Sequence, residues 1–247
     1  MITLLRPEPE PLDETELTAL YEVEDRDRPS LRANFVTSID GAVELDGYSE
    51  GLSGPADKQV FGLLRMVCDA LLVGAGTLRH EKYRGVRLDE SRRAWRRERG
   101  LADYPTLVVV SARLALKPTH PALADAPVRP IVVTHADADP AAREALAPVA
   151  DIIAVGAEGQ VDLAAGLAAL HDRGLRQVLC EGGPHLLASL TAADLIDEMC
   201  LTVSPLLTGP GAGRITAGPV NQDAPRTLTL RQALAAGDVL LLRYGRI

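Results

Sequence analysis

The chain has 247 residues, of which 47% are hydrophobic and 24% are charged, and its formal net charge is −8. This length suits one large domain with a sizeable core, and since only 3% of the residues are aromatic, Leu, Val, Ile and Ala must build that core. The acidic balance argues against a nucleic-acid-binding protein, which is usually basic overall or along one face.

Residues 1–29 read as a segment of their own before a single domain at residues 30–247. They are acidic and rich in proline, and residues 13–23 ("DETELTALYEV") have a helical pattern. We expect an N-terminal arm and a short helix that packs on the domain. The first residues lack the pattern of a signal peptide, and no uncharged apolar run reaches about 18 residues. These features predict a cytoplasmic protein that does not enter membranes.

Short apolar runs alternate with helical stretches over the rest of the chain. Because the runs are continuously apolar, they are typical of strands that helices cover on both faces. The expected strands are 32–38, 69–75, 106–111, 130–134, 151–155, 176–181 and 197–207, and the expected helices are 55–67, 139–150, 161–174 and 184–195. This order predicts an α/β domain with a mainly parallel sheet. Residues 226–244 predict an antiparallel strand pair at one edge.

The charged and metal-binding residue types indicate no special chemistry by themselves. Seven arginines between residues 84 and 99 are mixed with acidic residues, which is typical of a solvated helix face. Cys68, Cys180 and Cys200 lie in apolar stretches without paired spacing, so we expect buried free thiols in a reducing compartment. The five histidines show no ligand spacing, and no metal site is expected.

Glycine turns follow two of the expected strands, at Gly74–Thr77 and at Gly182–Gly183. Ligands bind beyond the carboxyl ends of parallel strands, where glycine lets backbone N–H groups approach a phosphate and the next helix offers its positive end. The first turn has Arg79 in place of the last glycine of a dinucleotide fingerprint, and the residues after it lack a clear helical pattern. Either turn alone can be a tight strand exit, but together they favour a dinucleotide pocket.

The expected strand 106–111 ends close to Ser111 and Arg113. A hydroxyl and a guanidinium at this place can hold the 2′-phosphate of a dinucleotide, because guanidinium matches phosphate in a bidentate way. This would select NADPH over NADH. The alternative is a polar strand exit with an exposed arginine.

Three segments together resemble the riboflavin-pathway pyrimidine reductase family: "NFVTSIDGAV", "GLSGPADKQVFGLLRMVCDALLVGAGT" and "LCEGGPHLLASLTAADLIDEMCLTVSPLLTGPG". This family is the C-terminal reductase part of the bifunctional riboflavin deaminase–reductase. The resemblance covers roughly residues 30–247. It implies a three-layer α/β/α fold like that of dihydrofolate reductase, a homodimer, and a stand-alone reductase, because the zinc-ligand spacing of the deaminase half is absent. The implied reaction is NADPH-dependent reduction of 5-amino-6-(5-phosphoribosylamino)uracil to the ribityl compound, without a metal.

The resemblance and the glycine turns together assign a site. The expected cofactor residues are Val36, Gly51, Gly74, Gly76, Thr77, Glu81, Ser111, Arg113, Gly182, Gly183, Pro184, His185, Leu186 and Leu187. The expected substrate residues are Asn34, Ser49, Ser53, Arg65, Arg87 and Glu181, and Asp40 and Glu181 are the expected catalytic residues.

Several of these residues also fit a purely structural role. Ser53 is well placed to cap a helix that starts at Pro55. Arg65 fits a surface ion pair, and Asp40 precedes a glycine as in a simple turn. Glu181 has the strongest functional case, because a carboxylate after a buried apolar run is costly unless it is paired or solvated.

The sequence also departs from the family pattern on the substrate side. The family commonly has Lys at Asn34, Trp at Gly51 and Asp-Asp-Pro at residues 81–83. Two alternatives therefore stay open. One is a reductase of the same fold that acts on dihydrofolate or another heterocycle, which would want a buried carboxylate to grip the pteridine ring. The other is a non-catalytic nucleotide-binding module, which would leave NADPH unoxidised.

Overall fold

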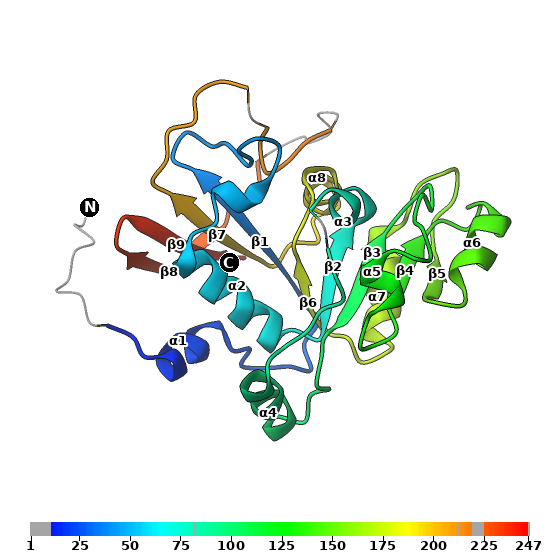
Figure 1. Cartoon of the computed structure of the whole chain (residues 1–247), viewed down its shortest axis with the longest axis horizontal. Coiled ribbons are helices and arrows are strands. Elements are labelled where there is room, and N and C mark those ends of the chain that lie inside the picture. Colours follow the sequence, from blue (N-terminus) through cyan, green and yellow to red (C-terminus); the bar gives the residue numbers. More distant parts are fainter. Residues whose placement is uncertain (1–10, 82, 212, 219–224, 247) are drawn as a thin grey trace.

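The computed structural model describes residues 11–81, 83–211, 213–218 and 225–246. Part of the predicted N-terminal arm, residues 1–10, lies outside this range. Within it, nine strands form one sheet in the order β5-β4-β3-β2-β6-β1-β7-β9-β8 (Figure 1). The strands are β1 (Ser30–Ser38), β2 (Ala70–Gly74), β3 (Thr106–Val110), β4 (Ile131–Thr134), β5 (Asp151–Ala154), β6 (Gln177–Cys180), β7 (Glu198–Ser204), β8 (Thr229–Ala236) and β9 (Val239–Gly245).

The strand directions confirm the predicted mixed sheet. Strands β1 to β7 pair in parallel, and β9 pairs antiparallel with both β7 and β8. Across the sheet, β6 lies between β2 and β1, and the order of the strands reverses at this point. The carboxyl ends of these three strands therefore meet at one place, where ligands bind in α/β sheets.

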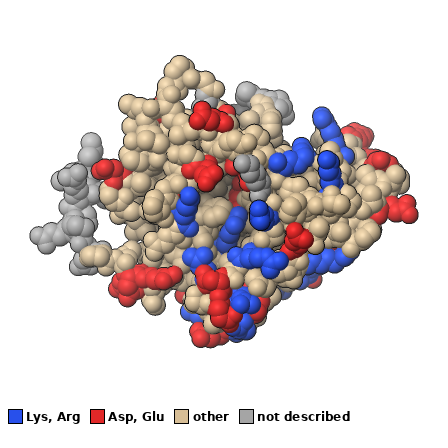
Figure 2. All heavy atoms as spheres, viewed as in Figure 1, with Lys and Arg blue, Asp and Glu red and all other residues tan. Residues whose placement is uncertain are grey.

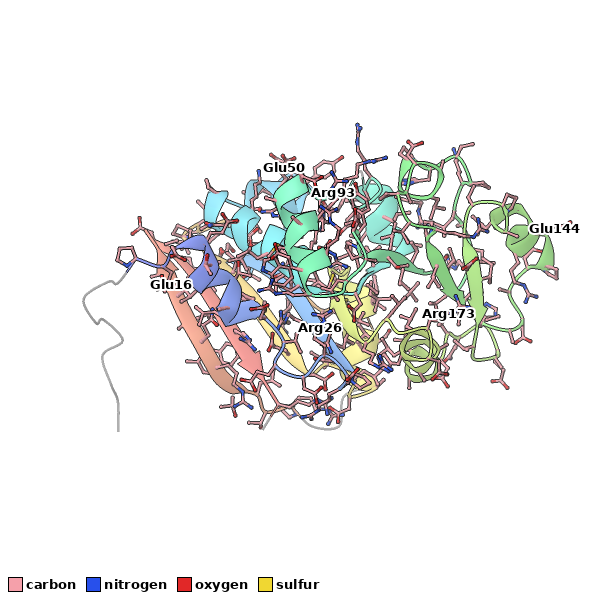
Figure 3. All side chains as sticks on the ribbon, turned by 90° about the horizontal axis from the view of Figure 1, so that it is seen from below. Glu16, Arg26, Glu50, Arg93, Glu144 and Arg173 are labelled. Atoms are coloured by element: carbon pink, nitrogen blue, oxygen red, sulfur yellow. The ribbon has the colours of Figure 1, made fainter. Side chains whose placement is uncertain are left out.

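Helices cover both faces of the sheet and make three layers. They are α1 (Glu14–Tyr21), α2 (Pro55–Val67), α3 (Ala75–His80), α4 (Glu90–Glu98), α5 (Pro121–Ala124), α6 (Pro140–Leu146), α7 (Leu163–His171) and α8 (Pro184–Ala192), with a 3₁₀ turn η1 (Ser49–Gly51). Figure 3 shows α1, α2 and α4 on one side of the sheet and α7 on the other. None of the helices in the described ranges is long and apolar enough to cross a membrane.

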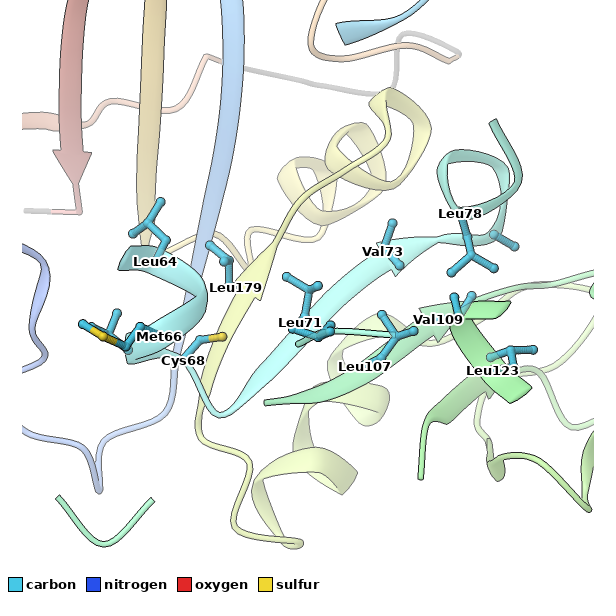
Figure 4. Packing of buried hydrophobic residues seen from close by; sticks show 14 of the residues in the cluster. Leu64, Met66, Cys68, Leu71, Val73, Leu78, Leu107, Val109, Leu123 and Leu179 are labelled. Carbon is cyan, nitrogen blue, oxygen red and sulfur yellow. The ribbon is translucent and has the colours of Figure 1, made fainter. Parts of the chain in front are cut away.

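Alternate residues of the central strands pack into two separate cores. Leu71 and Val73 of β2 point to the core under α2 and α5, where they meet Leu107 and Val109 of β3 (Figure 4). Leu72, between them in sequence, points to the core under α7 and α8. Both cores are fully buried, which explains why these strands are continuously apolar.

Helix α3 begins inside the first predicted glycine turn, at Ala75, and continues to His80, although the sequence there shows no clear helical pattern. This helix has only six residues, too few for a visible apolar period. Leu78 anchors it, since its side chain is completely buried in the first core. The turn therefore leads directly into a helix N-terminus.

The arginine-rich segment is solvated only in part, and this corrects the prediction for Arg96. Its side chain is 1% exposed. The guanidinium donates hydrogen bonds to the carbonyl oxygens of Met66 (2.7 Å), Cys68 (2.6 Å) and Ala102 (2.6 Å). Met66 and Cys68 lie at the end of helix α2, where carbonyl groups lack helical partners and a cation is favourable. Arg96 thus holds α4 to the end of α2.

Candidate functional site

One large cavity of about 1190 Å³ opens where β2 and β6 end, beside the second half of β1. Residues from these strands line it together with residues from the 43–53 loop, α2, α3, the 83–87 segment and the start of α8. Figure 2 shows Lys and Arg side chains gathered around the middle of this face of the molecule. A cavity of this size can hold a dinucleotide and a second ligand together.

The two predicted glycine turns lie against each other at the wall of this cavity. The Gly74 N–H donates to the Gly182 carbonyl oxygen at 2.7 Å. A Cβ atom at Gly183 would lie only 2.3 Å from Thr77 Oγ1, so no side chain fits there without movement. Gly182 has φ +96°, and a Cβ atom there would meet the Phe35 ring at 3.1 Å. Both glycines are therefore required by close packing at this turn.

Three of the described helices that begin at the cavity lack a side-chain cap, whereas in α5, which begins at the cavity with Pro121, the His120 ring accepts from the Ala122 N–H. Helices α2, α3 and α8 begin after Gly54, Gly74 and Gly183, and within the described part of the chain their N-cap residues offer no side chain to the first N–H groups. Helices α1, α4, α6 and α7 begin after Asp13, Asp89, Asp139 and Asp162, and each aspartate accepts such a bond. Uncapped N–H groups at a helix start are available to an anion.

Glu181, Arg65 and Tyr83 form a compact network inside the cavity. The Glu181 side chain is 2% exposed, and its two oxygens accept from Arg65 Nε (2.7 Å) and Arg65 Nη2 (2.6 Å). The Tyr83 hydroxyl donates to the same carboxylate. Burial, together with the charge of Glu181, raises the pKa of Tyr83 well above its usual value. Tyr83 therefore stays neutral, and the carboxylate serves as an anchor for both neighbours.

Arg65 does form an ion pair, but the pair lies in the cavity and not on the outer surface. Its guanidinium carbon lies 4.1 Å from the centre of the Phe61 ring. Stacking on an aromatic ring restricts the side chain further. Tyr83 and Phe61 were not among the predicted site residues.

A second buried carboxylate, Asp57, also lines the cavity and was missed by the sequence analysis. Asp57 Oδ1 accepts from Thr202 Oγ1 at 2.6 Å, and Oδ2 accepts from the Ser53 hydroxyl. The suggested cap role of Ser53 is wrong, because Gly54 is the N-cap of α2. The sequence signal for Asp57 was the spacing of four between residues 57, 61 and 65, because this spacing places them on one face of the helix.

Most predicted site residues line this one cavity. They are Val36, Gly74, Gly76, Thr77, Glu81, Gly183, Pro184, His185 and Leu186 on the cofactor side, and Asn34, Ser49, Ser53, Arg65, Arg87 and Glu181 on the substrate side. The loop and α3 are joined there, because the Ser49 N–H donates to Glu81 Oε1 at 3.3 Å.

The remaining predicted residues do not line the cavity. Gly51 packs on Leu45, Ser111 and Arg113 follow β3, and Gly182 and Leu187 are buried. Asp40 is exposed, and its carboxylate accepts from the backbone N–H groups of Thr208 (3.0 Å) and Gly209 (2.9 Å). The Ser38 hydroxyl and these N–H groups lower the pKa of Asp40 to about 2. In this geometry Asp40 orders a turn, and its catalytic role stays a prediction.

Comparisons with known proteins agree with the resemblance seen in the sequence. The RibD C-terminal domain model matches residues 29–242. The 2,5-diamino-6-ribosylamino-4(3H)-pyrimidinone 5′-phosphate reductase of Archaeoglobus fulgidus is 30% identical over 74% of this chain and 83% of its own. The protein of the same name from Methanothermobacter thermautotrophicus is 28% identical over 88% of this chain and 98% of its own.

A solved structure shows the same architecture. The pyrimidine reductase-like protein of Corynebacterium diphtheriae superposes with a TM-score of 0.80 at 26% identity, over 89% of this chain and 92% of its own. The expected dihydrofolate-reductase-like fold is thereby confirmed.

Proposed function

We propose that this chain, which belongs to the RibD C-terminal domain family, uses NADPH to reduce the ribosyl group of a 6-ribosylaminopyrimidine 5′-phosphate to the open ribityl chain. Its curated relatives are named reductases, so the reaction class follows from the family. The resemblance implies 5-amino-6-(5-phosphoribosylamino)uracil as the substrate, whereas the archaeal relatives are named for the 2,5-diaminopyrimidinone compound.

The observation that carries the proposal is that one cavity offers two separate places for phosphate. The first is the pair of glycine turns with the uncapped starts of α3 and α8. The second is the group of cations Lys58, Arg84 and Arg87, all exposed and all lining the cavity. Arg87 is held by a hydrogen bond from Nη2 to the Asp125 carbonyl oxygen (3.0 Å). A dinucleotide and a sugar phosphate need these two places.

The glycine turns fit the pyrophosphate of NADPH. The missing side chain at Gly183 leaves the start of α8 open, and no side chain of the described residues caps its first N–H groups. When bound, the cofactor would supply the hydride. We propose that Ser111 and Arg113 favour the 2′-phosphate. Equal affinity for NADPH and NADH would count against these two residues.

On the substrate side, the chain's own groups would position the ribosyl group. Both Glu181 oxygens already accept hydrogen bonds from Arg65, so we propose that Glu181 acts by holding Arg65 and Tyr83. Glu181 holds Arg65 through Nε and Nη2, and we expect Nη1 to donate to a substrate oxygen. The Tyr83 hydroxyl donates to Glu181 and keeps lone pairs that can accept a hydrogen bond from a sugar hydroxyl.

The test is to follow NADPH oxidation with the two ribosylaminopyrimidine phosphates and with dihydrofolate side by side. Turnover of either pyrimidine supports the proposal. Arg87→Ala should raise KM for that substrate and leave NADPH affinity unchanged, whereas Arg173→Ala, just after α7 and outside the cavity lining, should change neither. Tight NADPH binding without turnover of any substrate would instead support the non-catalytic nucleotide-binding module.

Reduction of dihydrofolate is the second candidate, and Asp57 is the observation that favours it. A pteridine reductase needs a buried carboxylate to grip the ring, and Asp57 lines the cavity at 5% exposure. The cations Arg84 and Arg87 have no evident role with a substrate that lacks a sugar phosphate. Turnover of dihydrofolate, without turnover of either pyrimidine, would support dihydrofolate reduction as the function.

We also propose a homodimer that buries the apolar face of β7 and β9. Leu201 pairs with Leu242 across these strands and Val203 pairs with Leu240, on the face opposite Cys200 and Leu241, which point into the first core. Leu240 is 45% exposed. Sedimentation analysis should show a dimer that Leu240→Glu weakens, and a monomeric wild-type protein would contradict this arrangement.

A further inference from the structure

Among the described carboxylates that line the cavity, Asp57 is the one that accepts a hydrogen bond from a hydroxyl group on each of its two oxygens. Thr202 Oγ1 of β7 donates to Oδ1, and the Ser53 hydroxyl donates to Oδ2. The residue is 5% exposed. Within the described ranges no Lys, Arg or His forms a salt bridge with it, unlike Glu181 beside Arg65. Its position is therefore set by neutral donors alone.

This arrangement leaves the carboxylate with unfilled acceptor capacity. An ionised carboxylate offers about four lone-pair sites, and each Asp57 oxygen uses one site on a hydroxyl. A buried carboxylate is costly unless its hydrogen bonds are completed. A ligand that presents two adjacent N–H donors would complete them in a bidentate way.

The pyrimidine rings of the two candidate substrates differ at the edge formed by N3 and the group on C2. A 2-aminopyrimidin-4(3H)-one presents N3–H beside the exocyclic 2-amino group, so both groups are donors. A uracil presents N3–H beside the O2 carbonyl, which would set one lone pair against a carboxylate oxygen. We propose that Asp57 selects the 2-amino-4-oxopyrimidine ring, so that the preferred substrate is the 2,5-diaminopyrimidinone compound and not the uracil. This inference rests on the proposed reductase function.

The neighbours of Asp57 on α2 support the same placement of the ring. Phe61 follows one turn later and Arg65 one turn after that, and all three line the cavity. This face of the helix thus offers an acceptor pair for a ring edge, a flat apolar side chain, and then the cation that Glu181 anchors. A polar heterocycle with a sugar attached matches that order of groups.

The test compares kcat/KM for the two ribosylaminopyrimidine phosphates, which differ only at C2. We expect the wild-type protein to prefer the 2-amino substrate by about 100-fold or more, because a site built for a donor leaves polar groups unpaired with the wrong ring. Asp57→Asn presents one acceptor and one donor, which matches the uracil edge. This variant should reduce the preference at least about tenfold or reverse it, with unchanged NADPH affinity.

A second variant and a binding measurement control for folding and for turnover. Ser53→Ala removes one hydroxyl but keeps the carboxylate, so it should retain the preference. The free bases, 2-aminopyrimidin-4(3H)-one and uracil, can be compared by equilibrium binding to the NADPH-loaded wild-type protein, where the first should bind more tightly. This measurement does not depend on any variant.

The outcomes separate the role of Asp57 from the reductase function. Equal use of both substrates by the wild-type protein, or an equal loss on both in Asp57→Asn, would overturn the role of Asp57. If neither pyrimidine is reduced, the proposed function fails, and the base comparison still decides whether Asp57 recognises the 2-amino edge. Dihydrofolate carries the same edge, so any reduction of it should also fall in Asp57→Asn.

Discussion

Gly183→Ala is the smallest change that should disrupt the proposed dinucleotide side of the cavity. The added Cβ atom would lie 2.3 Å from Thr77 Oγ1 and 3.7 Å from Thr77 Cβ. The backbone of Gly183 has φ −86° and ψ −167°, a region open to any residue. The substitution therefore carries no backbone penalty, and its effect must come from Thr77 and from the ligand that approaches the turn.

The expected magnitude follows from the contact with the Thr77 hydroxyl. A separation of 2.3 Å must open by about 1 Å before the atoms reach ordinary contact, and overpacking of this kind costs about 1–3 kcal/mol. The methyl group also stands where we propose that the phosphate approaches, and overpacking there should cost a similar free energy of cofactor binding. A loss of about 1–3 kcal/mol corresponds to roughly a 5- to 150-fold rise in the Kd for NADPH.

A double-mutant cycle separates the clash with Thr77 from the direct obstruction of the phosphate by the new methyl group. In Thr77→Ala the nearest atom to the new methyl group is a Cβ at 3.7 Å, which is ordinary contact. Thr77→Ala should therefore restore the thermal stability of Gly183→Ala, but not the NADPH affinity, since the methyl group still stands where the phosphate approaches. Full recovery of affinity in the double variant, by calorimetric titration, would show that Gly183 only makes room for Thr77. Gly183→Asp adds a charge facing the pyrophosphate and should abolish binding.

Three further predictions concern single side chains. Arg96→Met leaves buried carbonyl groups unpaired and should lower the free energy of unfolding by about 3 kcal/mol or more. The control is Arg97→Met, an exposed position on the same helix, which should change the free energy of unfolding by less than about 0.5 kcal/mol. Equal chemical-denaturation midpoints for the two variants would contradict this prediction. Since folding lowers the pKa of Asp40 to about 2, its contribution to stability is present above pH 4 and lost as the pH falls toward 2, so the melting temperatures of wild type and Asp40→Asn should converge over that range. Glu181→Gln leaves Arg65 without its carboxylate, and kcat/KM should fall about 100-fold or more at unchanged NADPH affinity; a loss of NADPH affinity instead would place Glu181 on the cofactor side.

The sequence predicted the sheet well because strands that are buried on both faces appear as continuous apolar runs. The expected strand 69–75 became β2 at Ala70–Gly74, and the antiparallel C-terminal pair was also found. The short helix α3 was missed, since six residues that are anchored by Leu78 alone show no period. Burial of Arg96 was missed for a similar reason, because its partners are backbone carbonyl groups and these have no sequence signature.

The glycine turns and the family resemblance were also readable from the sequence, because both depend on residue types at fixed positions after apolar runs. Tertiary structure alone decided which groups meet. The pairing of Arg65 with Glu181 joins residues 116 positions apart, and that of Asp57 with Thr202 joins residues 145 positions apart. Such pairs depend on how α2 packs across β6 and β7, and the local sequence carries no record of that packing. The fold, the glycine turns and the importance of Glu181 were therefore predictable, whereas the pairing of Glu181 with Arg65 and the place of Asp57 in the cavity were visible only in three dimensions.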